Sequence, residues 1–532
     1  MIKIIKNSKI DFALILALCS ISILLFSISN DYGISWDEDW HRTSGKRVGV
    51  FLGQQIGLFS NLSTDYPNKT DYHGIIFDTI CAFGEEIFGL QDSRKIYFMR
   101  HKLNVLFYLV GVVFFFYFSK YVFQKKSFAY IATSFYLVHP RLFANGFYNM
   151  KDSIVQVYVV IALFFLYKYL KTKKLSSLVF SGIFCGIATT TRIPIVYLAV
   201  YFSIFIYFSN YFSLEKKVFN NNKILKHIFI YNFVYLVSLL IFWPVLWKSP
   251  IIKFIEIFEL TKSYVVDNNQ FFMGDYVNSK DVPDIYLPVW ILVTTPISFL
   301  VFFLVGIISF LRQSLNKINF KTISNAFNLF CFFTPLTAAI IFNSTLYDSW
   351  RQFHFIYPFM VMIIMSGFTF ILSRLKLILN KEGLRPLLLL VFFTFSSPIY
   401  SLVKYHPNQF VYFNNFAGKD PMLNFDGDYW GLSYRQGLEY IAENDNRKKI
   451  KISVRNSPGR HNIKILEKKD RDRFEYVENI KESNYYLTNY RWKMKENYHL
   501  AKIDMHPVGK EYFSVNLGQM KILGVYKINL ND

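Results

Sequence analysis

Residues 12–29 read FALILALCSISILLFSIS, a run that contains no charged side chain. Comparable apolar runs lie at 103–118, 152–170 and 288–311. Each is close to the roughly 20 residues that a helix needs to cross about 30 Å of hydrocarbon. Because lipid cannot satisfy the hydrogen bonds of an irregular backbone, we expect these runs to be membrane-spanning helices.

The composition of the whole chain agrees with this interpretation. Of its 532 residues, 53% are hydrophobic and 18% are charged, whereas a soluble domain has about 25% charged residues. The formal net charge of +22 would suggest nucleic acid in a soluble protein. Here the basic residues flank the apolar runs and are expected to set membrane topology, so no nucleic-acid partner is predicted.

The four cysteines form no disulfide framework and no metal-binding spacing.

Apolar length and flanking charge predict about eleven spans. The first run follows Lys3, Lys6 and Lys9, as in a signal peptide, but it is long and has no small-residue cleavage site, so we expect it to be retained. The predicted spans are residues 12–29, 103–122, 127–142, 153–170, 175–190, 193–211, 226–247, 288–311, 325–343, 354–373 and 386–403.

The distribution of charge predicts the topology. If the N-terminus is cytoplasmic, lysines and arginines gather on every second loop, as the positive-inside rule requires. We therefore expect a multi-pass protein of the cell's inner (plasma) membrane. The other face then carries four external loops, at residues 30–102, 143–152, 248–287 and 344–353.

The chain divides into two predicted domains. Residues 1–403 form the transmembrane domain, and residues 404–532 form an extracytoplasmic soluble domain. Strand-like runs at 450–454, 485–487 and 522–528 and a helical stretch at 434–443 predict that this small domain is mixed α/β. The fold class is thus a polytopic all-α membrane protein with a small α/β domain.

Acidic residues stand at two predicted helix ends on the external face. The first external loop contains Trp36-Asp37-Glu38-Asp39-Trp40, and Asp152 opens a later helix. The acids of the first loop could simply be solvated neighbours of an interfacial aromatic belt. Asp152 could be present because the helix dipole stabilises an acidic residue at a helix N-terminus. Alternatively, a carboxylate at this face could be a general base, because a sugar hydroxyl that attacks an anomeric carbon must lose its proton.

Cationic residues are predicted on the same face. Arg192 lies between two apolar runs, where a buried arginine is costly and usually functional. The stretch 347–358 reads YDSWRQFHFIYP, and its arginine suits a phosphate because a guanidinium gives paired, charge-assisted hydrogen bonds. Snorkelling side chains at the interface are the alternative. The candidate phosphate-binding residues are Lys151, Arg192, Arg351, His354 and Tyr357.

Further residues could contact an acceptor or a sugar, namely Trp36, His73, Tyr347 and His406. The sequence shows no Gly-rich phosphate-binding loop, no nucleotide-binding signature and no zinc spacing. A donor carried by a nucleotide would usually need such a site. A donor carried by a lipid needs only a phosphate clamp near the membrane.

With these motifs the sequence resembles the polytopic GT-C glycosyltransferases, and among them the bacterial form of the protein O-mannosyltransferase and aminoarabinose-transferase branch. The resemblance rests on the pair Asp37–Glu38, on Asp152, on Trp350–Pro358, and on His406–Asn414 with Asp428–Gly431. It implies an undecaprenyl-phosphate-sugar donor, inverting transfer and Asp37 as the base. Some relatives use a divalent metal, and the sequence leaves metal dependence open.

The predicted function is therefore an inverting glycosyltransferase with a polyprenyl-phosphate-sugar donor and a glycan, lipid or protein acceptor. Asp37 or Glu38 would activate the acceptor, and Asp152 would orient it. A transporter or flippase of a lipid-linked glycan is the main alternative, although the sequence shows no internal repeat and its polar candidates lie at one face. A non-catalytic membrane scaffold is the third.

Overall fold

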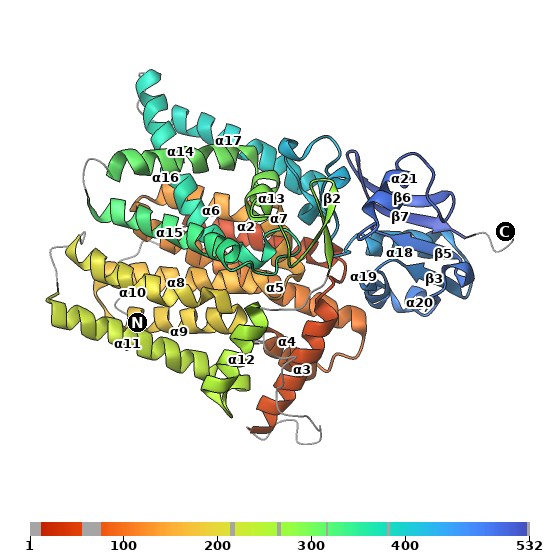
Figure 1. The fold of residues 1–532 in the computed structure, drawn as a ribbon, viewed down its shortest axis with the longest axis horizontal. Helices are drawn as coiled ribbons and strands as arrows, with labels where there is room; N and C mark the ends of the chain where they lie inside the picture. The colour runs from red at the N-terminus through yellow and green to blue at the C-terminus, as the bar shows by residue number, and fades with distance from the viewer. Residues whose placement is uncertain are drawn as a thin grey trace.

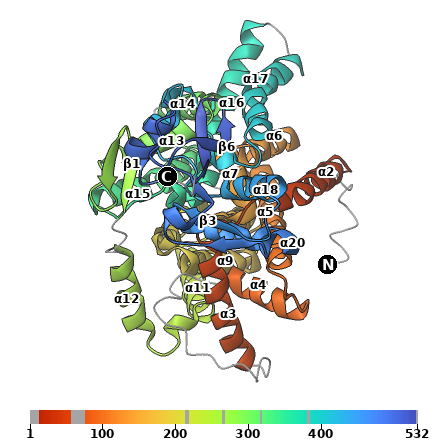
Figure 2. The same ribbon diagram turned by 90° about the vertical axis from the view of Figure 1, so that its right-hand side faces the viewer.

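The computed structural model describes residues 12–55, 76–212, 219–262, 268–314, 318–379 and 384–528. Long helices form a bundle, and a small α/β domain lies at one end of it (Figure 1). When this end faces the viewer, the α/β domain covers the middle of the helix ends and α3, α4 and α12 project beside it (Figure 2).

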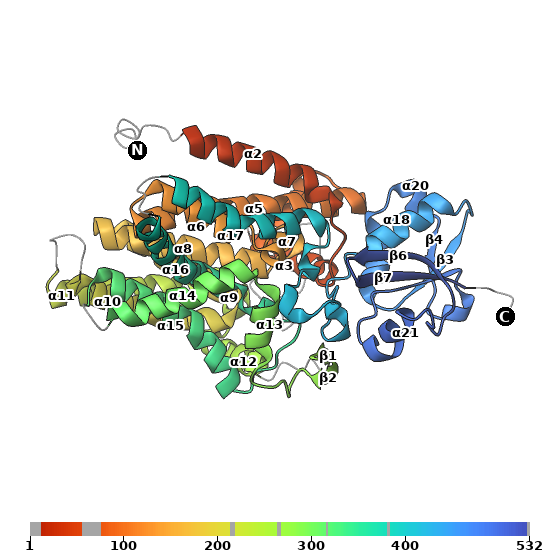
Figure 3. The ribbon, with the colours of Figure 1, turned by 90° about the horizontal axis from the view of Figure 1, so that it is seen from above.

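Eight helical segments of the described residues are long and apolar enough to cross a membrane, and two shorter apolar helices accompany them. These ten coincide with ten of the eleven predicted spans, so the chain is a multi-pass membrane protein. The first helix, α2, lies along one edge of the bundle (Figure 3). The ten helices are α2 (Phe12–Ile28), α5 (Ser93–Phe123), α8 (Asp152–Thr172), α9 (Leu175–Thr191), α10 (Val196–Tyr211), α11 (Asn221–Ile241), α14 (Ile297–Ser314), α15 (Phe320–Ile341), α16 (Tyr357–Ile378) and α17 (Arg385–Lys404).

The remaining predicted span, residues 127–142, is divided into two helices. α6 (Lys126–Leu137) ends before Pro140, and α7 (Pro140–Tyr148) begins there, with His139 in an extended conformation. Proline lacks an N–H and disfavours a helical residue before it, which explains the break. All nine residues of α7 are buried. Residues 143–148, which we expected in an external loop, are thus part of a buried helix.

The two long segments that the sequence predicts to be external also contain secondary structure. α3 (Glu38–Gln55) and α4 (Ile76–Ile87) follow α2. α12 (Pro250–Lys262), the hairpin of β1 (Asn269–Phe272) and β2 (Asp275–Asn278), and α13 (Tyr286–Thr294) follow α11. The predicted span 288–311 is interrupted between α13 and α14, where Thr295 is extended and Pro296 follows.

The C-terminal domain is mixed α/β, as the sequence predicts. Its sheet has the order β4-β3-β5-β7-β6, with β3 parallel to β4 and β5 and the other pairs antiparallel. The helices and strands of this domain are α18 (Tyr434–Asn444), β3 (Ile450–Val454), α19 (Ser457–His461), α20 (Lys468–Arg471), β4 (Phe474–Tyr476), β5 (Tyr485–Thr488), α21 (His499–Ala501), β6 (Glu511–Leu517) and β7 (Met520–Lys527). β4 and β6 were not expected, because β4 has three residues and β6 is mostly half-buried and irregular.

The segment between α17 and α18 belongs to the helix bundle rather than to the sheet. Arg141 donates from Nε to the Tyr412 carbonyl at 2.9 Å. Asn414 donates from Nδ2 to the carbonyls of Leu292 and Thr295, at 2.6 and 2.7 Å, where α13 ends. This segment therefore satisfies backbone groups that the break between α13 and α14 leaves unpaired.

Two glycines allow α14 and α16 to pack with their backbones in contact. A Cβ atom on Gly306 would lie 2.1 Å from the Ile363 carbonyl oxygen, and one on Gly367 would lie 1.9 Å from that of Phe302. Neither contact can be relieved by a side-chain movement. Small residues of this kind are what close helix packing in a membrane requires.

We expect Gly367→Ala to destabilise the bundle by about 2 kcal/mol, because α16 must move away from α14. Thermal unfolding of the detergent-purified protein would measure the effect as a lower midpoint. Gly84→Ala is the matched control, since its Cβ would make only ordinary contacts with the side chains of Met99, at 3.5 Å, and Leu103, at 3.9 Å. Equal midpoints for the two variants would contradict the backbone contact.

Candidate active site

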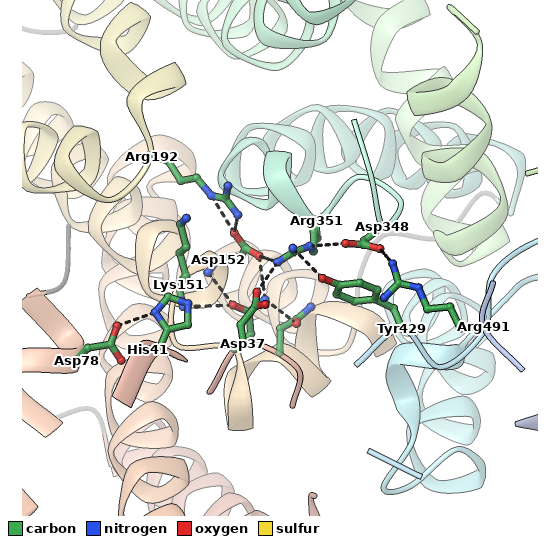
Figure 4. A network of polar contacts seen from close by, with 12 residues as sticks. Asp37, His41, Asp78, Lys151, Asp152, Arg192, Asp348, Arg351, Tyr429 and Arg491 are labelled. Carbon is green, nitrogen blue, oxygen red and sulfur yellow. Dashed lines mark hydrogen bonds and ion pairs between the residues drawn. The ribbon is translucent and has the colours of Figure 1, made fainter. Parts of the chain in front are cut away.

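A cavity of about 340 Å³ lies where the beginnings of α3 and α8 meet the C-terminal domain. Figure 4 shows its polar side chains converging from segments that are far apart in the sequence. The lining residues are Trp36, Asp37, Trp40, His41, Lys151, Arg192, Asn268, Tyr347, Asp348, Arg351, Tyr429, Arg491 and Trp492.

Arg351 lies at the centre of this site. Its Nη1 is 3.2 Å from Asp37 Oδ2 and 3.5 Å from Asp152 Oδ2, and its Nε is 3.4 Å from Asp348 Oδ2. Nη2 also donates to the Tyr429 hydroxyl at 3.0 Å. One guanidinium thus contacts three carboxylates and a phenol, which the several donors of arginine allow.

Asp152 is fixed at the first residue of α8. The Asn149 side chain accepts a hydrogen bond from the Asp152 N–H at 2.8 Å and donates one to its carboxylate at 3.0 Å. Arg192 donates to the other carboxylate oxygen from Nε at 3.0 Å and also from Nη2. Arg192 can reach it because it lies in the extended break between α9 and α10. Asp152 is 1% exposed. It therefore does not line the cavity but holds the two arginines that do.

Arg491 reaches the cavity from the C-terminal domain and pairs with Asp348. Its Nη2 is 2.7 Å from Asp348 Oδ1. Backbone on both sides of this contact is left-handed: Asp348 and Ser349 have φ of 59° and 63°, and Tyr490 and Trp492 both have φ of 63°. Such conformations cost free energy and persist where the surroundings impose them.

Aromatic rings form one wall of the cavity. The Arg491 guanidinium lies over the Tyr429 ring at 4.1 Å, and Trp36 packs edge-on against Trp492 at 5.6 Å. The Arg351 guanidinium also lies over Tyr429, at 4.9 Å. These contacts hold the arginines in place through cation–π attraction. The wall therefore presents flat aromatic rings beside charged groups.

Basic side chains line the cavity, among them those of Lys151, Arg192 and Arg351. Burial, with the charge of Arg192 nearby, holds the pKa of Lys151 well below its ordinary value. A bound anion would favour the protonated ammonium and reverse this effect. Burial also raises the pKa of Asp348 above the usual value for a carboxyl, although Arg491 and Arg351 oppose the shift.

Comparisons with known proteins agree with this architecture. A sequence model of the family described as dolichyl-phosphate-mannose-protein mannosyltransferase matches residues 72–247. The archaeal oligosaccharyltransferase AglB from Archaeoglobus fulgidus, in complex with an inhibitory peptide and a dolichol-phosphate, has the same fold. It aligns with a TM-score of 0.51 and 10% identity over 99% of this chain and 75% of that chain. The chain thus resembles this family over residues 72–247 and shares the fold of AglB.

A second solved structure of a GT-C protein, ArnT from Cupriavidus metallidurans bound to undecaprenyl phosphate, covers 97% of this chain and 98% of its own. Its TM-score is 0.47 and its identity to this chain is 10%. No curated protein matches the chain significantly.

The structure brings six of the predicted site residues to the cavity. Trp36, Asp37, Lys151, Arg192, Tyr347 and Arg351 line it, and Asp152 pairs with two of them. Asp37 is the most accessible of the three carboxylates on Arg351, with 29% of its side chain exposed against 1% for Asp152 and Asp348.

Four predicted residues point elsewhere. Glu38 is turned away, and its carboxylate accepts hydrogen bonds from the Ser35 N–H at 2.7 Å and from His101 at 2.9 Å. The Tyr357 hydroxyl donates to the Phe135 carbonyl within the helix bundle. His354 and His406 do not line the cavity: His354 packs edge-on to Trp350 at 5.0 Å, and His406 pairs with Asp31 at 2.8 Å. His73 lies outside the described residues.

Sequence reasoning missed seven lining residues, namely Trp40, His41, Asn268, Asp348, Tyr429, Arg491 and Trp492. Four of them had a signal nearby: Trp40 and His41 lie three and four residues after Asp37, Asp348 lies three residues before Arg351, and Tyr429 lies within the stretch Asp428–Gly431. Nothing in the sequence around Arg491 indicates that it contacts a residue 143 positions away.

The side chains of the cavity do not fit a divalent metal. Guanidinium groups contact both carboxylate oxygens of Asp152 and of Asp348 and one oxygen of Asp37, which leaves too few carboxylate oxygens to bind a cation. Among the described residues, no group of three or more His, Cys, Asp and Glu side chains could hold a metal ion.

Asp348 depends on two arginines, so we expect their removal to be non-additive. Either Arg351→Ala or Arg491→Ala leaves one partner, whereas the double variant leaves a buried, unpaired carboxylate. The double variant should lose about 1–3 kcal/mol of stability beyond the sum of the single losses, and Asp348→Asn should restore much of it. Thermal unfolding in detergent measures these losses, and Arg374→Ala, on the exposed far end of α16, is the additive control. Strict additivity of Arg351→Ala and Arg491→Ala would contradict the shared partner.

Proposed function

We propose that this protein is an inverting glycosyltransferase that moves a hexosyl or pentosyl group from a polyprenyl-phosphate sugar to an extracytoplasmic glycan, lipid or protein. The observation that carries the proposal is the composition of the cavity. It places one accessible carboxylate, Asp37, beside the cations of Lys151, Arg192 and Arg351. A base and an anion clamp in one site are what this transfer requires.

The cations suit the phosphate of the donor. Arg192 and Arg351 are held by Asp152, so their positions do not depend on a ligand. When the bond between the anomeric carbon and the phosphate oxygen breaks, negative charge remains on the polyprenyl phosphate. Guanidinium groups already in place stabilise that charge without reorganisation, and the charge in turn favours the protonated form of Lys151.

Asp37 suits the role of the base. The acceptor hydroxyl attacks the anomeric carbon from the side opposite the phosphate and transfers its proton to the carboxylate. Arg351 contacts Asp37 at 3.2 Å, and this pairing orients the carboxylate. Glu38 is occupied by Ser35 and His101, so the proposal rests on Asp37.

An apolar groove next to the cations suits the polyprenyl chain. It has a volume of about 340 Å³ and is lined mainly by apolar residues of α10, α12, α15 and the segment before α16, including Ile193, Ala338 and Phe353. Ile193 directly follows Arg192, and Phe353 lies two residues after Arg351. A lipid in the groove would thus have its phosphate near both arginines.

The distribution of charge along two helices supports an extracytoplasmic active site. Asp152 opens α8 and Lys171 lies in its last turn, and at 1.5 Å per residue these ends are about 30 Å apart. Arg351 likewise opens a predicted membrane span whose other end carries Arg374 and Lys376. With the basic ends in the cytoplasm, the cavity faces the other side of the membrane and the N-terminus is cytoplasmic.

The first test is sugar release by the purified protein from a panel of radiolabelled polyprenyl-phosphate sugars. We expect transfer from one donor, and a fall of about 10²–10⁴-fold in kcat/KM for Asp37→Asn, because the general base is lost. Glu38→Gln should stay within several-fold of wild type, since its amide oxygen can still accept from the Ser35 N–H. Full activity of Asp37→Asn would refute its role as base. Tight donor binding without release of any sugar would instead favour the transport of a lipid-linked glycan.

The groove allows a matched test of lipid binding. Ala338→Trp should fill the groove and weaken binding of a polyprenyl phosphate at least tenfold, because the chain and the indole compete for the same space. Ala326→Trp is the control: it is the same change on the same helix, but it fills a different apolar pocket, twelve residues or about 18 Å away. Binding can be measured by native mass spectrometry. Equal effects of the two variants would place the chain elsewhere.

A further inference from the structure

A buried network of charged residues joins α3, α4 and α5 behind the cavity. Arg100 is fully buried and pairs with Asp78 at 2.7 Å and with Glu85 at 3.3 Å. Glu85 also pairs with Arg42 and Lys46, at 2.9 and 3.0 Å. One residue that contacts this network also reaches the cavity.

That residue is His41, whose Nδ1 is 2.9 Å from Asp78 Oδ2. Asp78 is 3% exposed and is held in place by Arg100. The helices α3 and α4 are in direct contact one turn further on, where a Cβ atom on Gly45 would lie 2.6 Å from Asp78. The close packing of α3 on α4 and the ion pair between Arg100 and Asp78 therefore fix the position of the imidazole.

The same contact sets which ring nitrogen carries the proton. An ionised carboxylate can only accept hydrogen bonds, so Nδ1 of His41 must be the donor to Asp78. In the neutral ring, Nε2 then bears a free lone pair. His41 lines the cavity (Figure 4), and among the described residues its ring makes no other hydrogen bond.

A second histidine–carboxylate pair in the same region shows the contrast. His101 contacts Glu38 at 2.9 Å, but both side chains are completely enclosed and neither lines the cavity. His41 is thus the member of the two pairs that a substrate can reach. It also follows Asp37 by one helical turn, with its N–H donating to the Asp37 carbonyl at 2.9 Å.

We propose that His41 is a further substrate-binding residue, whose Nε2 accepts a hydrogen bond from a carbohydrate hydroxyl beside the group that reacts at Asp37, and that Asp78 is its positioning residue. This inference rests on the proposed function and extends it. Sugars carry neighbouring hydroxyls, and two acceptors one helical turn apart can hold two of them. The hydroxyl belongs either to the donor sugar or to the acceptor.

Steady-state kinetics with both substrates varied would identify the partner. His41→Ala should raise the KM of one substrate about tenfold, the effect of losing one hydrogen bond, with a smaller change in kcat. His41→Gln, which keeps an acceptor near the Nε2 position, should recover part of the loss. A raised KM for the donor assigns the hydroxyl to the donor sugar, and a raised KM for the acceptor assigns it to the acceptor. Unchanged KM values for both would overturn the proposal.

Asp78→Asn tests the positioning role against a matched control. Its amide oxygen would accept from Arg100, which leaves the N–H₂ group to face His41 and moves the ring proton to Nε2. The KM should then rise as in His41→Ala. Glu85→Gln also removes one of the two carboxylates on Arg100 but does not touch His41, so it should stay within about twofold of wild type. Equal losses in both variants would assign Asp78 a structural role only.

The ring proton can also be observed without any transfer reaction. In ¹⁵N-histidine-labelled protein, long-range ¹H–¹⁵N spectra distinguish the two tautomers, and His41→Gln assigns the signal among the ten histidines. We expect the proton on Nδ1 in the wild type and on Nε2 in Asp78→Asn. A wild-type proton on Nε2 would overturn the proposal. Inactive wild-type protein with the proton on Nδ1 would instead contradict the proposed function and leave this geometry standing.

Discussion

The guanidinium of Arg351 is the contact on which the site depends. It joins Asp37, from the segment after the first helix, to Asp152 at the start of α8 and to Asp348 in its own turn. Two of these carboxylates are shielded from water, and a buried carboxylate without a cation would be very unfavourable. The separate helices are thus held in one arrangement because their charges can be satisfied only together. A cavity with fixed cations and one accessible carboxylate follows from this constraint.

The C-terminal domain is a structural part of this arrangement. Arg491 neutralises Asp348 at 2.7 Å, and Trp492 and Tyr429 complete the aromatic wall. On the membrane side, Asn414 satisfies carbonyls at the end of α13. The domain boundary in the sequence therefore does not separate two independent functional units, because the later segment supplies partners to the earlier one.

The sequence predicted the helices well because each long apolar run has one stable solution in a membrane. It also placed Asp37, Lys151, Arg192 and Arg351 on one face, since alternate loops must lie on the same side. The division of 127–142 was harder to predict, because a short apolar segment before a proline fits either a span or two helices. The residues alone could not decide whether Asp37 or Glu38 faces the cavity. The two are adjacent, and the turn before α3 determines the direction of each carboxylate. Arg491 could not be found, since its partner is 143 residues away and its loop is shaped by tertiary contacts alone.

The long separation between Asp348 and Arg491 has a consequence for biosynthesis. At a synthesis rate of about 5–20 residues per second, the ribosome makes the second residue on the order of 10 s after the first. During that interval the membrane helices are inserted while Asp348 lacks the guanidinium that arrives last. Arg351, three residues after Asp348, is the cation that can pair with it in the meantime. Arg491 and Trp492 line the cavity, so the site acquires its complete wall only when the C-terminal domain has been made and has folded.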